Sequence, residues 1–224
     1  MRVVKLMALG SALALAGGLL GSATGAAAAH PKALPAAGTR VVTVDVDGDA
    51  VPDTVTVEQS GPVNYVVNVV TAAGRADVAG FSSTIKTDWG IEPWLGAARM
   101  DRVKGHELLL ATSGGDGYFF RVLSWRAGGL AWQKAPRSRM LGSYDWYVGS
   151  SGFVRYGYRF STVAGRRYVR DFELYPSGSH WKGTVVKSVW RDGAWRKVST
   201  RKVDLSASQA AAWEGIGVTL VHTP

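Results

Sequence analysis

At Val41–Val57 the chain reads VVTVDVDGDAVPDTVTV, two runs of alternating apolar residues that flank an acidic turn. Alternation with a period of two predicts two half-buried strands. The turn places Asp45, Asp47, Asp49 and Asp53 at positions one, three, five and nine of a loop, an arrangement that folds oxygen ligands around a hard cation such as Ca²⁺. The stretch therefore predicts a strand pair whose loop binds calcium. The alternative is an Asp/Gly turn without an ion, because the same residues favour turns.

The rest of the chain repeats this pattern. From Arg40 onward, strand-like runs alternate with turn residues at short, regular spacing, which is typical of an all-β fold. A shift of 54 residues, from Asp53 to Glu107, lays Asp53–Arg75 over Glu107–Gly129 without a gap, and Phe172–Trp195 is a looser third copy. Each copy reads as a strand, a Gly-containing turn, a longer strand and a tight hairpin. We therefore predict repeated antiparallel β-meander units.

Three dipeptides predict tight turns between strands of the second half. Gly128-Gly129 and Asp192-Gly193 suit two-residue primed turns. Ala164-Gly165 is expected to reverse the chain between two further strands.

One short C-terminal helix is expected over Ala207–Trp213. Ser206, followed three residues later by Gln209, forms a capping box at its start, and Gly215 is able to end it. We expect this helix to cover an end of the sheet.

The beginning of the chain has the layout of a secretory signal peptide. After a basic start, Leu6–Leu20 is an apolar run and Ala27-Ala28-Ala29 offers a small-residue cleavage site. The predicted organisation is a signal peptide at 1–29, a Pro/Ala-rich linker at 30–39 and a single all-β domain at 40–224. No later run has membrane-spanning length, and cysteine is absent, so a secreted domain must rest on its core or on a bound ion.

Charge is distributed unevenly. Residues 30–118 contain 7 Lys+Arg and 11 Asp+Glu, whereas residues 119–224 contain 17 and 6, so the net charges are −4 and +11. A basic half favours an anionic polymer or carbohydrate at the cell surface as partner. No specific nucleic acid is expected.

Tryptophan is concentrated in the basic half. Trp125 and Trp190 recur at the same point of the repeat, so we expect them in the core. Trp146 and Trp181 lie in turn-rich segments, and we expect these two on the surface, where an aromatic ring suits a sugar or a polyanion.

The loop DVDGDAVPD resembles the calcium loop of FG-GAP or VCBS-type repeats, the blades of integrin-like β-propellers, whose pattern is D-x-D-G-D-G-x-x-D followed by a strand. The resemblance implies that Asp45, Asp47, Asp49 and Asp53 are the carboxylate ligands and that Val51 offers a backbone carbonyl. It also implies a β-propeller-like fold, here partial or degenerate. Three units cannot close a typical ring, so the alternatives are a partial propeller, an assembly of several chains and a sandwich.

The loop departs from the family pattern at Ala50, where the family has the glycine that makes the sharp turn. An L-residue in a left-handed conformation costs about 1–2 kcal/mol. We therefore expect either a weaker ion site or a distorted loop.

The second copy of the loop is predicted to bind no ion. It keeps Asp101 and Glu107, but Arg102, Lys104 and His106 place basic side chains where a cation would sit. We expect the two carboxylates to cap turns. The dipeptide His106-Glu107 lacks the second histidine and the helix of a zinc-binding H-E-x-x-H motif.

No motif for nucleophilic catalysis or phosphate binding is present at Ser150-Ser151 or at Ser113–Gly117. The sequence predicts a secreted, non-catalytic, calcium-stabilised module of the binding or adhesion type. One alternative is a secreted polymer-degrading hydrolase, whose paired carboxylates are defined only in three dimensions. Another is a secreted inhibitor or structural partner of a second protein.

Overall fold

The computed structural model describes residues 38–85, 91–137 and 143–222. The predicted signal peptide, and the predicted linker as far as residue 37, lie outside the described residues. The first strand, β1, begins at Thr39. The described chain is built from antiparallel strands and one short helix, so the all-β prediction is confirmed. None of its helices has the length and apolarity required to span a membrane.

The strands form two antiparallel sheets. The first has the order β1-β2-β3-β4, with β1 at Thr39–Val44, β2 at Asp53–Gln59, β3 at Asn64–Val70 and β4 at Ala76–Ser82. The second begins with β5 at Trp94–Ala98, β6 at Glu107–Gly114, β7 at Gly117–Arg126, β8 at Gly129–Gln133 and β9 at Trp146–Ser150. It continues with β10 at Arg155–Val163, β11 at Arg166–Ser177, β12 at His180–Arg191 and β13 at Ala194–Ser206.

The two sheets contain three successive four-stranded meanders: β1–β4, β5–β8 and β10–β13. The first half of β7 pairs with β9 and its second half with β8, so that β9 joins the second meander to the third. The 54-residue repeat is visible in the pairing, because Val44 faces Asp53 in the first meander and Ala98 faces Glu107 in the second. The predicted repeat is thus confirmed as a repeat of strand register.

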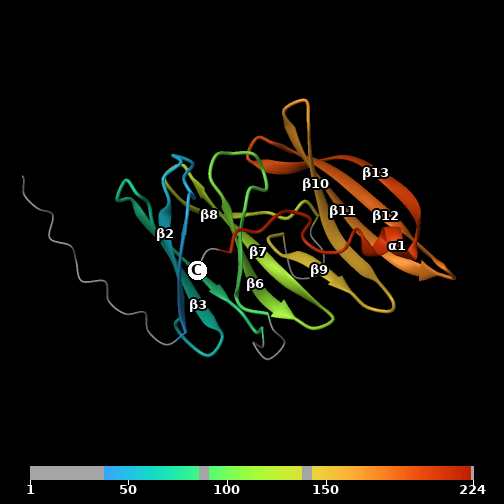
Figure 1. The fold of residues 1–224 in the computed structure, drawn as a ribbon, viewed down its shortest axis with the longest axis horizontal. Helices are drawn as coiled ribbons and strands as arrows, with labels where there is room; N and C mark the ends of the chain where they lie inside the picture. Colours follow the sequence, from blue (N-terminus) through green and yellow to red (C-terminus); the bar gives the residue numbers. More distant parts are fainter. Residues whose placement is uncertain (1–37, 86–90, 138–142, 223–224) are drawn as a thin grey trace, which may run out of the picture. The chain divides into compact units, whose positions relative to one another are not determined.

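Three hydrophobic clusters hold the meanders together. Leu108 and Leu110 of β6 pack in a cluster with valines of β1–β3, whereas Leu109, on the other face of β6, packs in a second cluster with residues of β9–β11 and β13. The middle meander is therefore buried on both faces, which explains why β6 reads as a continuous apolar run. Figure 1 shows β2 and β3 to one side of β6–β8 and β10–β13 to the other.

Two of the three predicted two-residue turns lie at the predicted residues, and the third is shifted by one residue. Asp192-Gly193 and Ala164-Gly165 form two-residue turns in which both residues have positive φ, as type I′ turns require. Between β7 and β8 the turn residues are Ala127-Gly128, because Arg126 pairs with Gly129. The predicted pair Gly128-Gly129 was therefore wrong by one residue. Ala127 has a φ of 50°, and an alanine in the sequence does not predict a positive φ.

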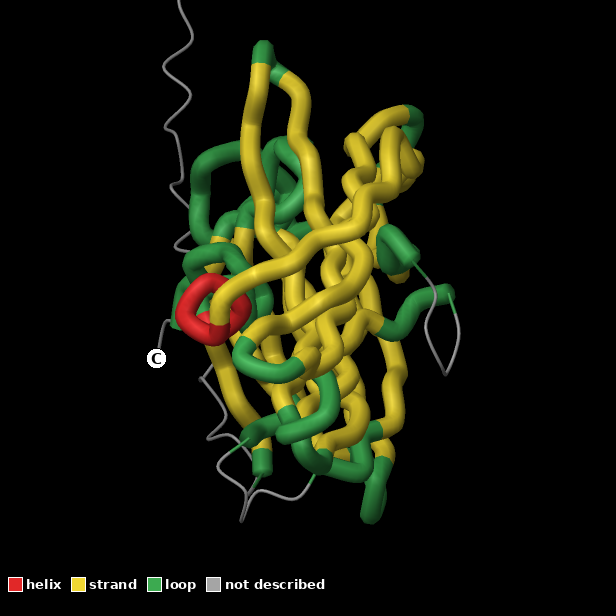
Figure 2. The backbone as a smooth tube through the Cα atoms, turned by 90° about the vertical axis from the view of Figure 1, so that its right-hand side faces the viewer, coloured by secondary structure: helices red, strands yellow, loops and turns green. Residues whose placement is uncertain are grey.

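The predicted helix exists as α1, Ala207–Ala211, which Figure 2 shows in red. Both hydrogen bonds of the capping box are present: Gln209 N–H donates to Ser206 Oγ, and Ser206 N–H donates to the Gln209 side chain. The helix ends at its C-cap, Ala212, and does not continue to Trp213 as predicted. Ala210 packs on the outer face of the third meander, in a third cluster with Phe172 and Val185.

After α1 the chain returns along the first strands of the third and second meanders. Tyr158 N–H of β10 donates to Gly215 O at 2.9 Å. Further on, Ala97 of β5 and Val221 exchange two backbone hydrogen bonds of 3.1 and 2.7 Å. The C-terminal segment thus connects the two meanders by backbone pairing.

The structure corrects the assignment of one tryptophan. Trp146 is fully buried at 0% exposure, because β9 lies in the middle of the large sheet, so its predicted surface position was wrong. Trp181 is half-buried, with the Arg155 guanidinium 4.4 Å from its ring centroid. Trp125 and Trp190 pack into or against the core, as predicted.

Candidate metal-binding loop

The loop between β1 and β2 brings three carboxylates together. One carboxylate oxygen from each of Asp45, Asp47 and Asp49 lies within 4.8 Å of the other two. Each side chain is held by a backbone N–H of its own loop: Gly48 donates to Asp45 at 2.7 Å, Asp49 to Asp47 at 3.2 Å and Val51 to Asp49 at 2.8 Å. The bonds to Asp47 and Asp49, which each span two residues, are Asx turns, and the bond to Asp45 spans three residues. All three orient the carboxylates within the loop.

An arginine that the sequence analysis did not single out reaches this cluster. Arg75, in the turn between β3 and β4, donates from Nη2 to Asp47 Oδ2 at 2.6 Å. The Asp47 side chain is 2% exposed, whereas the Arg75 side chain is 53% exposed. One positive charge therefore already offsets part of the negative charge of the three aspartates, and it comes from an exposed side chain whose guanidinium also lies 5.8 Å from the Trp125 ring centroid.

Asp53 lies outside the cluster of three. It is buried, and its Oδ2 accepts the N–H groups of Val46 at 2.7 Å and Asp47 at 3.3 Å, while its Oδ1 accepts the N–H of Ala72 at 2.8 Å. Asp53 thereby ties the start of the loop to the turn after β3. Val51 is exposed and contacts Asp49 through its N–H. The structure thus groups three of the five predicted ligand residues and gives Asp53 a hydrogen-bonding role.

Ala50 has a φ of 70°, in the left-handed region that the family pattern reserves for glycine. Ala50→Gly should raise the free energy of unfolding by about 0.5–1 kcal/mol, because relief of about 1–2 kcal/mol exceeds the added unfolded-state entropy of about 0.4–1 kcal/mol. Urea denaturation measures this change. The matched control is Ala73→Gly, at an exposed alanine without positive φ, which should lower stability. A loss of stability in Ala50→Gly equal to that in the control would show that the backbone at Ala50 is not strained.

The second loop repeats the hydrogen bonds of the first. Its residues 54 positions later have the same roles: Met100 N–H donates to Glu107 as Val46 does to Asp53, and Val103 N–H donates to Asp101 as Asp49 does to Asp47. Arg102, at a φ of 75°, occupies the position of Gly48, at a φ of 84°. The predicted turn-capping role of these carboxylates is confirmed.

In the second loop a guanidinium lies between the carboxylates. Arg126 of β7 donates from Nη2 to Asp101 Oδ2 and to Glu107 Oε1, both at 2.7 Å, and Gln133 donates to Asp101 at 2.9 Å. Asp101 and Glu107 are 1% and 0% exposed. Burial, followed by the nearby Asp101 charge, raises the pKa of Glu107 from its ordinary 4.5 to about 7. Arg126 thus bonds both carboxylates of the second loop, whereas in the first loop Arg75 bonds only Asp47.

The two loops pack against each other backbone to backbone. His106 donates its backbone N–H and its Nδ1–H to Asp45 O, both at 2.9 Å. A Cβ added at Gly105 would lie 2.2 Å from Val46 O, and one added at Gly48 would lie 2.3 Å from Lys104 Cβ. The second loop therefore braces the first, and glycine is required on both sides of the contact.

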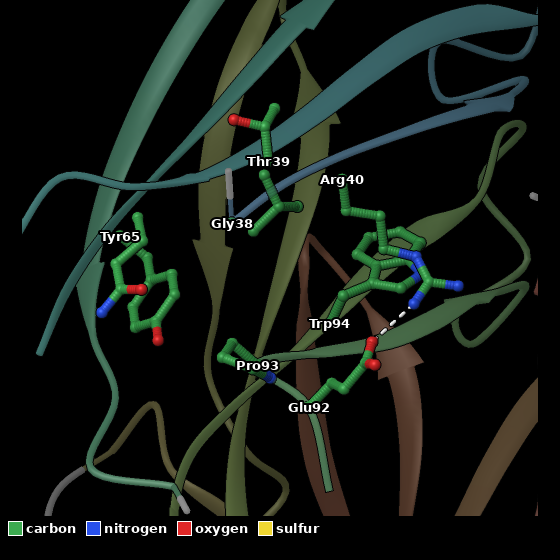
Figure 3. A pocket seen from close by; sticks show the side chains of 9 residues that line it. Gly38, Thr39, Arg40, Tyr65, Glu92, Pro93 and Trp94 are labelled. Carbon is green, nitrogen blue, oxygen red and sulfur yellow. Dashed lines mark hydrogen bonds and ion pairs between the residues drawn. The ribbon is translucent and has the colours of Figure 1, made fainter. Parts of the chain in front are cut away.

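Two places near the first two meanders lack the paired carboxyl groups that the hydrolase alternative requires, whereas two open hollows, one lined by Glu173 and Asp204 and the other by Asp116 and Glu214, each contain two carboxylates. A glycosidase needs two carboxyl groups on either side of a substrate, but the pair Asp101 and Glu107 is buried beneath Arg126. A hollow of about 340 Å³ near the start of β1 contains the single carboxylate Glu92, which pairs with Arg40 at 2.6 Å (Figure 3). Neither place presents two free carboxyl groups to a cavity.

Comparison with known proteins identifies no family for this chain. No family model matches it, and neither a curated protein nor a solved structure shows significant similarity to it. Any functional inference therefore rests on the loop Asp45–Asp53, the repeat and the surface of this molecule.

Proposed function

We propose that this chain is a secreted, non-catalytic binding module of the adhesion type, built from blade-like units of the FG-GAP/VCBS kind and stabilised by one structural calcium ion. The observation that carries the proposal is the preoriented triad of Asp45, Asp47 and Asp49, with an oxygen of each within 4.8 Å of the other two. Three carboxylates so close together repel one another, and the single Arg75 guanidinium offsets only part of this charge, so a bound cation would stabilise the cluster. Oxygen-only donors suit Ca²⁺.

The arrangement of the strands supports the blade-like part of the proposal. Each unit is a four-stranded antiparallel meander, and successive units share apolar clusters, although β9 also joins the second and third units into one sheet. The candidate calcium loop is followed directly by β2, in agreement with the family pattern, in which a strand follows the loop. The chain is then a short series of blades in place of a closed ring.

Arg75 sets the expected strength of the site. Its guanidinium competes with an ion for Asp47 Oδ2, at 2.6 Å, and Ala50 adds strain. Both features favour a weak site, in the range of Kd about 10⁻⁴–10⁻³ M that extracellular calcium modules use. A site of this strength is filled outside the cell and empty inside it.

The test is a thermal melt of residues 30–224 in a chelator and then in millimolar Ca²⁺. At a free Ca²⁺ concentration about 100 times Kd the ion should add about 2.7 kcal/mol to the free energy of unfolding, seen as a rise in Tm. Asp49→Asn keeps the acceptor for Val51 N–H but removes the charge, and it should abolish the rise. Arg75→Gln should lower the Ca²⁺ concentration needed for half of the rise.

Glu58→Ala is the matched control, because Glu58 is an exposed carboxylate on β2 outside the cluster. It should leave the calcium response unchanged. A Tm that does not respond to Ca²⁺ in the unaltered protein, or a response that persists in Asp49→Asn, would contradict the calcium site.

A further inference from the structure

The third meander has one face in the core and one face outside it. On the inner face, the cross-strand pair Trp190 and Trp195 packs in the cluster shared with β9 and β10. On the outer face, Phe172 and Val185, which are also direct cross-strand partners, pack beneath α1. The residue opposite Val185 on β13 is Arg201. At this level of the sheet the apolar surface beneath α1 therefore does not extend to the edge strand, β13.

Beyond the part that α1 covers, the outer face carries a group of basic side chains. Direct cross-strand partners share a face, so the strand register assigns them to it. A β-bulge opposite Lys187 and Ser188 shifts β13 by one residue, so that Arg196 and Arg201 lie on the same face although they are five residues apart. Arg170 lies opposite Lys187, and Arg196 lies opposite Val189. The members of this basic face are Arg166, Arg170, Lys187, Arg196 and Arg201.

The basic face contains an unfavourable arrangement of charge. Arg170 is the direct cross-strand partner of Lys187 on one side and of Arg159 on the other. Directly opposed side chains have Cβ atoms about 4.5–5.5 Å apart, and like charges at this separation destabilise a sheet. Three cations therefore form a row across β10, β11 and β12 at a cost to folding.

Within the described residues, the cations of this face contact only neutral groups. Lys187 Nζ lies 4.1 Å from the ring centroid of Tyr168, and Arg170 donates to Ser161 Oγ at 3.3 Å. Arg126 and Arg121, by contrast, each bond a carboxylate at 2.7–2.8 Å. Arg159 of the row is bound to the carbonyls of Ala212 and Glu214, whereas the exposed Arg166, Arg196 and Arg201 of the basic face remain open to an external anion.

We propose that the basic face binds an unbranched phosphate polymer, which it contacts through the phosphate groups alone. Four of its five cations are arginines, whose planar forks match phosphate oxygens, and a row of cations complements a linear chain of anions. The aromatic ring on this face, Tyr168, is covered by Lys187, so it offers no platform for a base or a sugar. The inference deepens the proposed binding function by naming its partner class, and it does not depend on calcium.

The test measures binding of residues 30–224 to long-chain inorganic polyphosphate. Titration over a salt series should give a log Kd that rises linearly with log salt concentration, because each neutralised phosphate releases counterions. The double variant Arg196→Glu/Arg201→Glu should weaken binding at least tenfold and flatten the salt slope. Both residues are exposed on the edge strand, and circular dichroism checks that the variant folds.

The matched control is Lys182→Glu/Lys202→Glu. It changes the net charge by the same amount on the same region of β12 and β13, but Thr184 and its partner Lys202 lie on the opposite face from Val185 and Arg201. The control should bind within about twofold of the unaltered protein. Equal losses of polyphosphate affinity in the two double variants would mean that only the net charge of the protein matters, and would overturn the proposal.

Three further ligands define the partner class. Single-stranded DNA, polygalacturonate and vesicles with anionic lipid should each bind more weakly than polyphosphate, and tighter binding of any of them would overturn the choice of partner. If polyphosphate does not bind while Ca²⁺ still raises Tm, the inference fails and the calcium-stabilised module stands. If it binds equally well with Asp49→Asn, the inference stands without the calcium site.

Discussion

Replacing Arg126 by methionine should lower the free energy of unfolding by about 3–5 kcal/mol, the usual loss when a buried ion pair loses one partner. The guanidinium is the shared partner of Asp101 and Glu107, both fully buried. Methionine keeps much of the side-chain volume but leaves two adjacent carboxylates without a counter-charge. Urea denaturation at pH 8 measures the loss.

The unfolding free energy lost in Arg126→Met should be smaller at pH 5 than at pH 8. The pKa of Glu107 is raised to about 7 in the presence of Arg126, and removal of the guanidinium raises it further. Below that pKa the folded variant holds a neutral Glu107 and avoids the repulsion; as pH rises through it, the unpaired charge must form and stability falls. Arg196→Met, at an exposed position on β13, is the control and should change stability by less than about 0.5 kcal/mol. A loss in Arg126→Met no larger than in this control would contradict the role of the arginine.

Gly105→Ala should lower the free energy of unfolding by about 3 kcal/mol. The residue has a φ of 91°, and its new Cβ would lie 2.2 Å from Val46 O. A left-handed alanine costs about 1–2 kcal/mol, and forced displacement of the packed first loop adds about 1–3 kcal/mol. Chemical denaturation measures the total, and the calcium response of the first loop should weaken with it.

Gly74→Ala separates the cost of a left-handed backbone from the cost of steric contact with the first loop. Gly74 has a similar φ of 78°, but nothing lies within 4 Å of its added Cβ. This variant should show the backbone contribution alone, about 1 kcal/mol after the gain from a stiffer unfolded chain. Equal losses of unfolding free energy in Gly105→Ala and Gly74→Ala would mean that the close packing of the two loops adds no steric cost.

Most of the strand order could be predicted from the sequence, because it depends on local signals. Alternation at Val41–Val57, the shift of 54 residues and the capping box at Ser206 are each visible within a short window, and each recurs in the structure. The errors arose where a local signal was ambiguous. Trp146 follows a turn-rich segment, but its strand is inserted between β7 and β10 in the middle of the sheet.

The candidate site was only partly predictable. The grouping of Asp45, Asp47 and Asp49 follows from their spacing in one loop, since Asx turns bring neighbouring carboxylates together. The two arginines do not follow, because Arg75 and Arg126 reach their carboxylates from another strand or turn, 28 and 19–25 residues away. Spacing within one loop identifies candidate ligands, whereas the neutralising arginine depends on the tertiary fold.

The return of the C-terminal segment has a consequence for the order of folding. Ala97 pairs with Val221, so the free edge of β5 is completed only after synthesis has reached a residue 124 positions further on (221 minus 97). Contacts between residues so distant in sequence form late and slowly. The first meander is able to form by local pairing while the chain is still emerging, whereas the middle one keeps an open strand edge until the last residues arrive. Premature release of the chain would therefore leave an unpaired edge available to other chains.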